Sequence, residues 1–179
     1  EERVFVTMLG GGAGTLASVG MEGLHTQELM AKELGMTSMS MPSRTTRDHM
    51  AEYVTILALF ASTSTKMARE VYTLMKQEYG EAEERITEGQ VGSSTMPQKR
   101  NPKISQRIIA NAAKVRVFVP LAFESMQEEH EADASGDQMI NAAINEACVI
   151  TNEIILGLID LFEGVNLYPE RMRQNLDLS

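Results

Sequence analysis

The residues best suited to chemistry lie together between residues 89 and 103, where the charge pattern changes sign. The stretch before them is acidic, whereas this one holds Lys99 and Arg100 and no acid. Asn101 and Pro102 are typical of an N-cap and a first helical position, so free backbone N–H groups and the positive end of a helix dipole would face the loop. A carboxylate or developing enolate held there would meet cations and amides together. The pattern predicts an anion site; a solvated loop with an ordinary cap is the alternative.

The elements that must position this loop can be read from helix breakers and apolar spacing. A glycine cluster interrupts the first helix candidate, Pro120 is expected to kink the third, and Pro169 opens a short fifth helix. The four long candidates run from about Val4 to Leu34, from Thr45 or Thr46 to near Gly80, from Pro102 to the acidic cluster at 128–131, and from Asp137 to Phe162.

Two of these helices carry regular apolar stripes at spacings of three, four or seven residues. The stripe of the second helix is Tyr53, Ile56, Phe60, Met67, Val71 and Leu74, and that of the fourth is Ile140, Ala143, Ala147, Ile150, Ile154 and Leu161. Long helices with one apolar face bury that face against antiparallel neighbours. No alternation typical of strands competes with this pattern. The sequence therefore predicts an all-α fold, a long antiparallel helical bundle.

The composition indicates a cellular compartment for the chain and excludes some classes of binding partner. Sixteen basic residues against 25 acidic ones give a net charge of −9, which argues against nucleic-acid or anionic-membrane partners. The longest apolar runs are shorter than a bilayer span, and the first residues show no signal-peptide pattern. A single cysteine, Cys148, excludes a disulfide framework and indicates the reducing cytoplasm. No His, Cys or carboxylate spacing suits zinc or calcium, so we expect no metal.

One string of residues resembles a known signature. Residues 92–102, GSSTMPQKRNP, resemble the GSSxMPxKxNP signature of the fumarase/aspartase superfamily. Residues 7–15 resemble the GGAxGT stretch of the branch that contains adenylosuccinate lyases and 3-carboxy-cis,cis-muconate cycloisomerases, and residues 47–53 resemble its RDxxAE segment. Residues 129–131 resemble the HE segment of that branch, and residues 171–178 resemble the RMxxNLDL of its cycloisomerases.

The resemblance implies that residues 1–179 form the central helical-bundle domain of a larger subunit, without that subunit's amino-terminal and carboxy-terminal domains. Such subunits form homotetramers whose active sites are shared between subunits. Family members eliminate a group β to a carboxylate, and the cycloisomerases run a related addition that closes a lactone. Neither reaction uses a metal or an organic cofactor. The chain is therefore expected to belong to a lyase or cycloisomerase of a small polycarboxylate, and to be inactive alone.

The resemblance also assigns roles within the signature. Ser93 would be the catalytic base, Lys99 and Asn101 would hold a substrate carboxylate, and Ser94 would support the loop. Serine is a very weak base, so the oxyanion of Ser93 must be stabilised by Lys99, amides and the helix end in a site closed to water. The glycines and serines of the loop suit a lid.

Four residues outside the signature are further candidates for substrate binding. Thr15 follows the glycine segment, where a backbone can approach a ligand closely. Arg44 and Arg47 lie at the start of the second helix candidate and could pair with a carboxylate, although surface ion pairing explains them equally well. His130 lies between two glutamates and could line a cleft; a surface histidine at a helix end is the alternative.

Three functions stay open at this point. Ala132 stands where adenylosuccinate lyases carry an Arg that serves the substrate, and Gln106 stands where many family lyases place a Glu that pairs with a catalytic His. Both features favour a 3-carboxymuconate cycloisomerase, although the tryptophans typical of that group are absent. The alternatives are a fumarate-releasing C–N lyase of the adenylosuccinate or argininosuccinate lyase type and, in another class, a non-catalytic helical scaffold. The intact Ser93, Lys99 and Asn101 favour an enzyme.

Overall fold

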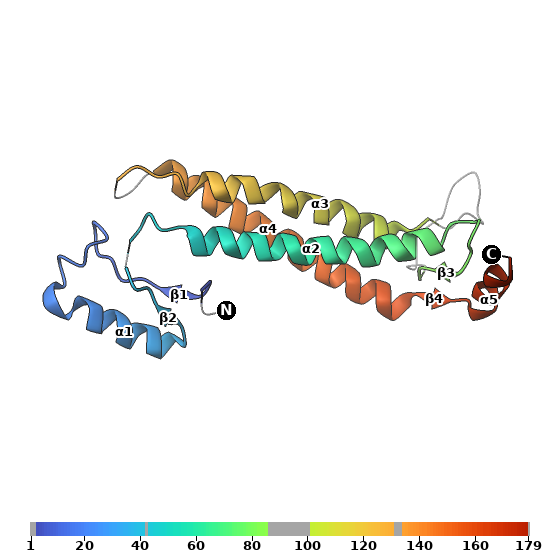
Figure 1. Cartoon of the computed structure of the whole chain (residues 1–179), viewed down its shortest axis with the longest axis horizontal. Coiled ribbons are helices and arrows are strands. Elements are labelled where there is room, and N and C mark those ends of the chain that lie inside the picture. The colour runs from blue at the N-terminus through green and yellow to red at the C-terminus, as the bar shows by residue number, and fades with distance from the viewer. Residues whose placement is uncertain (1–2, 42, 86–100, 131–133, 179) are drawn as a thin grey trace. The chain divides into compact units, whose positions relative to one another are not determined.

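The computed structural model describes residues 3–41, 43–85, 101–130 and 134–178 (Figure 1). Helices dominate it, which confirms the all-α prediction. The chain divides into two compact units, residues 1–57 with 117–147 and residues 58–116 with 148–179. The three longest helices contribute residues to both units, and each unit is described by itself. That residues 1–179 form one domain stays a prediction.

The first unit contains α1 (Gly23–Leu34) and a small parallel pairing of β1 (Val6–Thr7) with β2 (Thr37–Ser38). The buried side chain of Gln27 joins these parts, since it accepts a hydrogen bond from the Leu9 amide at 2.9 Å and donates to the Met39 carbonyl at 2.8 Å. Helix α1 ends at Leu34, as the sequence predicts, and the next residue, Gly35, has a left-handed backbone. The start of the predicted helix is wrong, because residues 4–19 contain a strand and turns.

The glycine segment explains why this helix begins late. A Cβ atom at Gly10 would lie 2.9 Å from Cα of Gly14, so the two backbones approach more closely than side chains allow. The amide of Leu16 donates to the Gly10 carbonyl at 3.0 Å and closes the turn. A short 3₁₀ helix, η1 (Gly20–Glu22), then leads into α1.

The long helices are close to their predicted ranges. They are α2 (Asp48–Leu74), α3 (Lys103–Glu124) and α4 (Ala134–Gly164), followed by the short α5 (Pro169–Asp177) with its proline in the first turn. Helix α2 ends before Gly80, and a turn in which the Gly80 amide donates to the Lys76 carbonyl at 2.7 Å follows it. Pro120 lies inside α3.

The buried face agrees with the prediction on α4 and differs from it on α2. Five of the six predicted α4 residues are buried; Ile150 is half-buried. On α2 the predicted residues Ile56 and Phe60 are exposed, at 46% and 38%. Alanines take their place because small side chains let helices pack closely. The buried α2 residues are Ala51, Val54, Ala58, Ala61, Ser64, Ala68 and Val71.

In the second unit, α3 runs antiparallel to both of its neighbours. Asn111 of α3 donates to Glu153 of α4 at 2.8 Å, and Arg116 donates to Thr65 of α2 at 3.2 Å. Further toward the start of α3, Gly157 of α4 packs against Ile108, where a Cβ atom would lie 3.0 Å from Cγ1. At the end of the bundle, β3 (Ala82–Glu83) pairs antiparallel with β4 (Asn166–Leu167).

Helix α4 alone among the described helices is long and apolar enough to cross a membrane by length and composition, with 28% of its most apolar window buried. The sequence reading found no such run. A core helix of a soluble protein meets the same criterion. In the second unit, two acidic residues of α4 contact other segments: Glu153 accepts a hydrogen bond from Asn111 of α3, and Asp160 forms an ion pair with Arg85. These polar contacts fit a helix packed within a protein bundle.

Candidate active site

Three of the predicted site residues, Ser93, Ser94 and Lys99, lie outside the described residues, so their roles stay predictions. The described part resumes at Asn101, which is half-buried. Its carbonyl accepts a hydrogen bond from the Lys103 amide at 2.8 Å, directly before α3. The predicted helix start at Pro102 is therefore correct to within one residue.

The first turn of α3 already binds a carboxylate of this chain. Glu84 accepts hydrogen bonds from the amides of Ile104 at 2.8 Å and Ser105 at 2.9 Å, and Glu84 is 6% exposed. A negative charge at this position also interacts favourably with the helix dipole. The amides that the sequence assigned to a substrate anion are thus occupied. Sequence reasoning missed Glu84 because the contact joins residues 20 positions apart, with no local pattern to mark it.

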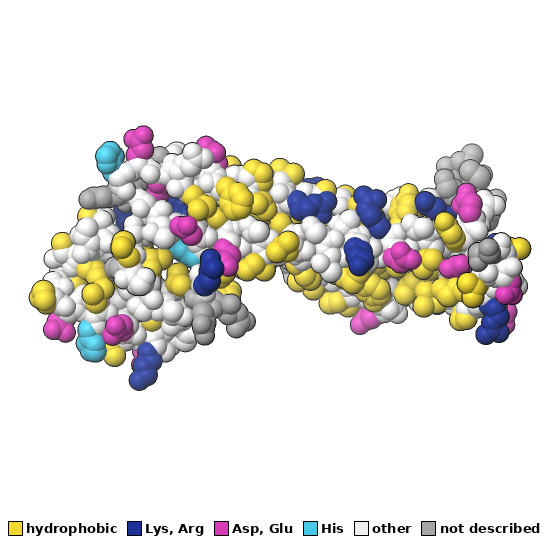
Figure 2. Space-filling view, viewed as in Figure 1, with side chains coloured by type: hydrophobic (Ala, Val, Ile, Leu, Met, Phe, Trp, Pro, Cys, Tyr) yellow, Lys and Arg dark blue, Asp and Glu magenta, His cyan; other side chains and the backbone are white. Residues whose placement is uncertain are grey.

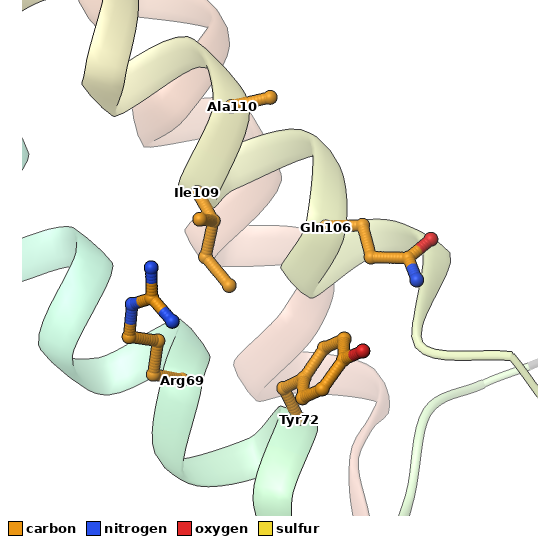
Figure 3. Close-up of a pocket in the computed structure, with 5 residues that line it drawn as sticks. All are labelled: Arg69, Tyr72, Gln106, Ile109 and Ala110. Atoms are coloured by element: carbon orange, nitrogen blue, oxygen red, sulfur yellow. The ribbon is translucent and has the colours of Figure 1, made fainter.

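A groove of about 320 Å³ lies beside the start of α3, between that helix and α2. Figure 3 shows the hydroxyl of Tyr72 and the amide of Gln106 at one end of the groove and the guanidinium of Arg69 farther along α2. Ile109 and Ala110 supply the apolar wall. The groove therefore offers a cation, a phenol and an amide to a polar ligand. Arg69 and Tyr72 were not singled out from the sequence, which contains no motif around them.

In the first unit, the structure brings Arg44 to the glycine segment. Its guanidinium donates to the Gly12 carbonyl at 3.1 Å, and a Cβ atom at Gly14 would lie 3.4 Å from the Arg44 amide nitrogen. Thr15, next along the chain, is exposed. Two of the predicted substrate-binding residues thus lie at one place, where an exposed cation and a hydroxyl flank a tightly turned backbone.

Arg47 has a different environment. It is 5% exposed and pairs with Glu128, whose side chain is 1% exposed, and with Asp137 at 2.7 Å. Burial opposes the charge of the guanidinium, but hydrogen bonds and attraction from Asp137 and Glu128 outweigh it and raise the pKa of Arg47. The arginine remains charged and is committed to two carboxylates of its own unit.

His130 lies two residues beyond Glu128, between α3 and α4. It is exposed, and its backbone has a positive φ of 58°. Among non-glycine residues such a conformation is uncommon and marks a tight turn. Glu128, which is bound by Arg47, thus lies two residues before the turn that carries His130.

Comparison with known proteins shows which family the chain belongs to. The sequence profile of a family described as lyase matches residues 1–117. The chain belongs to this lyase family, part of the fumarase/aspartase superfamily. It is 36% identical over 99% of its length to 3-carboxy-cis,cis-muconate cycloisomerase of Pseudomonas aeruginosa, and 35% identical over 100% to adenylosuccinate lyase of Methanothermobacter thermautotrophicus.

A solved structure of the lyase superfamily shares the fold. The 3-carboxy-cis,cis-muconate lactonizing enzyme from Pseudomonas putida matches with a TM-score of 0.86 and 30% identity over 99% of this chain. The chain spans about two fifths of the length of the relatives it matches, 39% and 40% for the two sequences above.

Proposed function

We propose that the complete protein is a lyase-type enzyme like 3-carboxymuconate cycloisomerase, which acts on a small polycarboxylate. The observation that carries the proposal is the match to cycloisomerases along 99% of this chain in both sequence and structure. The chemistry is β-elimination or the reverse addition through an aci-carboxylate. It needs no metal or organic cofactor.

In this proposal Ser93 is the base that takes the proton from the carbon next to a carboxylate. The electron pair moves into that carboxylate, and the resulting dianion is stabilised by Lys99 and Asn101 before the bond to the leaving oxygen or nitrogen breaks. Run in reverse, a carboxylate oxygen adds to a double bond and the lactone closes. Because Glu84 occupies two amides of α3, the charge of Lys99 and the side chain of Asn101 must supply most of this stabilisation.

The other candidates have separate parts in this proposal. Arg44 and Thr15 bind a second carboxylate of the substrate, since an exposed cation and a hydroxyl lie beside the glycine turn. Ser94 supports the signature segment, and His130 contacts substrate from its exposed turn. Arg47, held by Glu128 and Asp137, acts through the structure around it rather than by touching the substrate, in line with the ion-pairing alternative that the sequence left open.

The exposed apolar side chains support assembly with other subunits. Within the second unit, Figure 2 shows hydrophobic side chains gathered over α4. Contiguous apolar surface of this kind is typical of protein interfaces. We therefore propose a cytoplasmic homotetramer with shared active sites, no nucleic-acid or membrane partner, and no activity in this chain alone. The exposed apolar residues of α4 in this unit are Val149, Ile155, Leu156, Ile159 and Phe162.

A fumarate-releasing C–N lyase is the second candidate. It is favoured by the 35% identity to an adenylosuccinate lyase over the whole chain. Ala132, which argued against adenylosuccinate, lies outside the described residues. A non-catalytic scaffold of the same fold is the candidate from another class, and activity measurements separate it from both enzymes.

The test is an ultraviolet absorbance assay of the complete gene product, with Ser93→Ala as the matched variant. Substrates are 3-carboxymuconate, adenylosuccinate, argininosuccinate and simple N-substituted aspartates, followed as muconate disappears or fumarate appears. We expect turnover of 3-carboxymuconate that Ser93→Ala abolishes. Turnover of a substituted aspartate instead would favour the C–N lyase. A folded tetramer that turns over no substrate would favour the scaffold, and equal rates in both proteins would remove Ser93 as the base.

A further inference from the structure

The motif at residues 171–178 has no part in the proposed reaction, yet its side chains make specific contacts. Asn175 donates to the Tyr79 carbonyl at 3.0 Å and to the Glu81 carboxylate at 2.7 Å. Arg171 donates to the same Tyr79 carbonyl at 3.0 Å. The two residues are four positions apart on α5, so they project from one face of the helix. That face is bonded to the segment that follows α2.

The same segment is held at two further points by the chain before α5. The pairing of β3 with β4 is extended by the Tyr168 amide, which donates to the Glu81 carbonyl at 2.9 Å. The Tyr168 hydroxyl donates to the Glu83 carboxylate at 2.6 Å. Figure 1 shows α5 beside these two strands in the second unit. Residues 79–83 are therefore fixed by backbone pairing and by side chains of α5.

The next residue in this fixed segment is Glu84, whose carboxylate caps the first turn of α3 through Ile104 and Ser105. Arg85, directly after it, pairs with Asp160 of α4. Hydrogen bonds to a buried carboxylate are stronger than bonds between neutral groups. Contacts thus run from α5 to residues 79–83, then through Glu84 to the start of α3, three residues beyond Asn101.

We propose that Glu84 is a positioning residue for the reaction, and that Arg171 and Asn175 of α5 hold Glu84 in place. This inference rests on the proposed function, in which Asn101 holds a substrate carboxylate. The Glu84 cap fixes where α3 begins and hence where Asn101 stands. It also joins the chain just before residues 86–100 to the chain just after them, the interval of sequence that contains Ser93 and Lys99.

The geometry favours positioning over a purely local cap. A helix is ordinarily capped by the residue that precedes it, whereas here the cap comes from 20 residues upstream. The cap therefore ties the start of α3 to residues 79–84 rather than to its own preceding residue. Because catalysis is sensitive to misplacement on the order of 1 Å, loss of this constraint should slow turnover more than it weakens folding.

The experiment compares Glu84→Ala, Glu84→Gln and Asn175→Ala in the complete protein, with Glu78→Gln and Gln174→Ala as exposed controls from the same two segments. The first readout is hydrogen exchange at the amides of Ile104 and Ser105, which does not depend on activity. We expect exchange about tenfold faster or more in Glu84→Ala. Asn175→Ala should accelerate it less, and Glu84→Gln, which keeps one acceptor oxygen, should preserve part of the protection.

The second readout is the division of the effect between kcat and KM. We expect kcat to fall by about 10- to 100-fold in Glu84→Ala, with a smaller change in KM, an unaltered far-ultraviolet circular dichroism spectrum and partial rescue by Glu84→Gln.

Unchanged exchange in Glu84→Ala would overturn the cap, and unchanged exchange in Asn175→Ala would overturn the role of α5. Faster exchange with unchanged kcat would overturn positioning. An unmodified protein that is inactive on every substrate would contradict the proposed function, while the exchange rates still decide on the cap.

Discussion

At the scale of single residues, the ion cluster of Arg47 shows how a side chain suited to substrate binding can be committed elsewhere. A Cβ atom at Gly136 would overlap the carboxylate of Glu128, so the glycine leaves room for this side chain beside α4. The other oxygen of Glu128 is buried without a hydrogen-bond partner among the described residues. The charge of Glu128 therefore depends on Arg47 for compensation.

Replacing Arg47 with Ala should destabilise the first unit strongly, because it leaves the Glu128 carboxylate buried without a cation. We expect the free energy of unfolding to fall by about 3–5 kcal/mol, measured by urea denaturation. In the Arg47→Ala background, Glu128→Gln should restore part of this loss, whereas in the unmodified protein it should destabilise. Additive effects of the two substitutions would contradict the coupling.

His49 gives a prediction on pH at the same scale. Its Nδ1 atom is buried without a partner among the described residues, and burial lowers the pKa of the imidazole below 6.5 despite the nearby charge of Asp48. Below the unfolded pKa the unfolded chain then binds more protons than the folded one. The stabilising contribution is therefore present above pH 6.5 and lost as the pH falls toward the folded pKa.

We expect the urea midpoint to fall between about pH 7 and about pH 5, and to fall less in His49→Gln, because the variant removes one proton linkage and leaves the carboxylates unchanged. His25→Gln, at an exposed position on α1, is the matched control and should follow the unmodified protein. Equal pH dependence in the unmodified protein and in His49→Gln would show that burial does not shift this histidine.

At the scale of elements, the sequence correctly predicted features that depend on residues close together in the chain, such as helix ends and the buried face of α4. Gly35 ends α1, Pro169 opens α5, and the stripe of α4 is buried largely as its spacing predicts. The sequence did not reveal the late start of α1, which depends on backbone contacts among glycines, or the alanine face of α2, which depends on the distance to neighbouring helices. The Glu84 cap and the contacts of α5 with Tyr79 join residues 20 to 96 positions apart, beyond any local pattern.

The packing of α3 against α4 in the second unit is testable at Gly157. A side chain there would press on α3, since a Cβ atom would lie 3.0 Å from Cγ1 of the buried Ile108. Gly157→Val should lower the free energy of unfolding by about 1–3 kcal/mol through overpacking. Ala142→Val, at an exposed position on the same helix, should cost only about 0.5 kcal/mol from helix propensity. Equal thermal midpoints for the two variants would show that α3 can move away at no cost.

At the scale of the whole molecule, the exposed face of α4 bears on the proposed tetramer. Ile159 lies three or four residues from Ile155, Leu156 and Phe162, all at least 41% exposed, so the four side chains form one apolar face. Leaving such a face in water is unfavourable by about 25 cal/mol per Å² of apolar area. A second subunit that covers it would recover this free energy.

Ile159→Glu should therefore reduce the assembly of the complete protein without unfolding it, because a charge would have to be buried at the contact. Size-exclusion chromatography with light scattering should show a tetramer for the unmodified protein and smaller species for the variant, while far-ultraviolet circular dichroism stays unchanged. Gln174→Glu adds the same charge at an exposed position of α5 and should remain tetrameric.

If active sites are shared between subunits, the smaller species should also lose activity in proportion to the lost tetramer. A monomeric unmodified protein, or a fully active monomeric variant, would contradict sites shared across the α4 face.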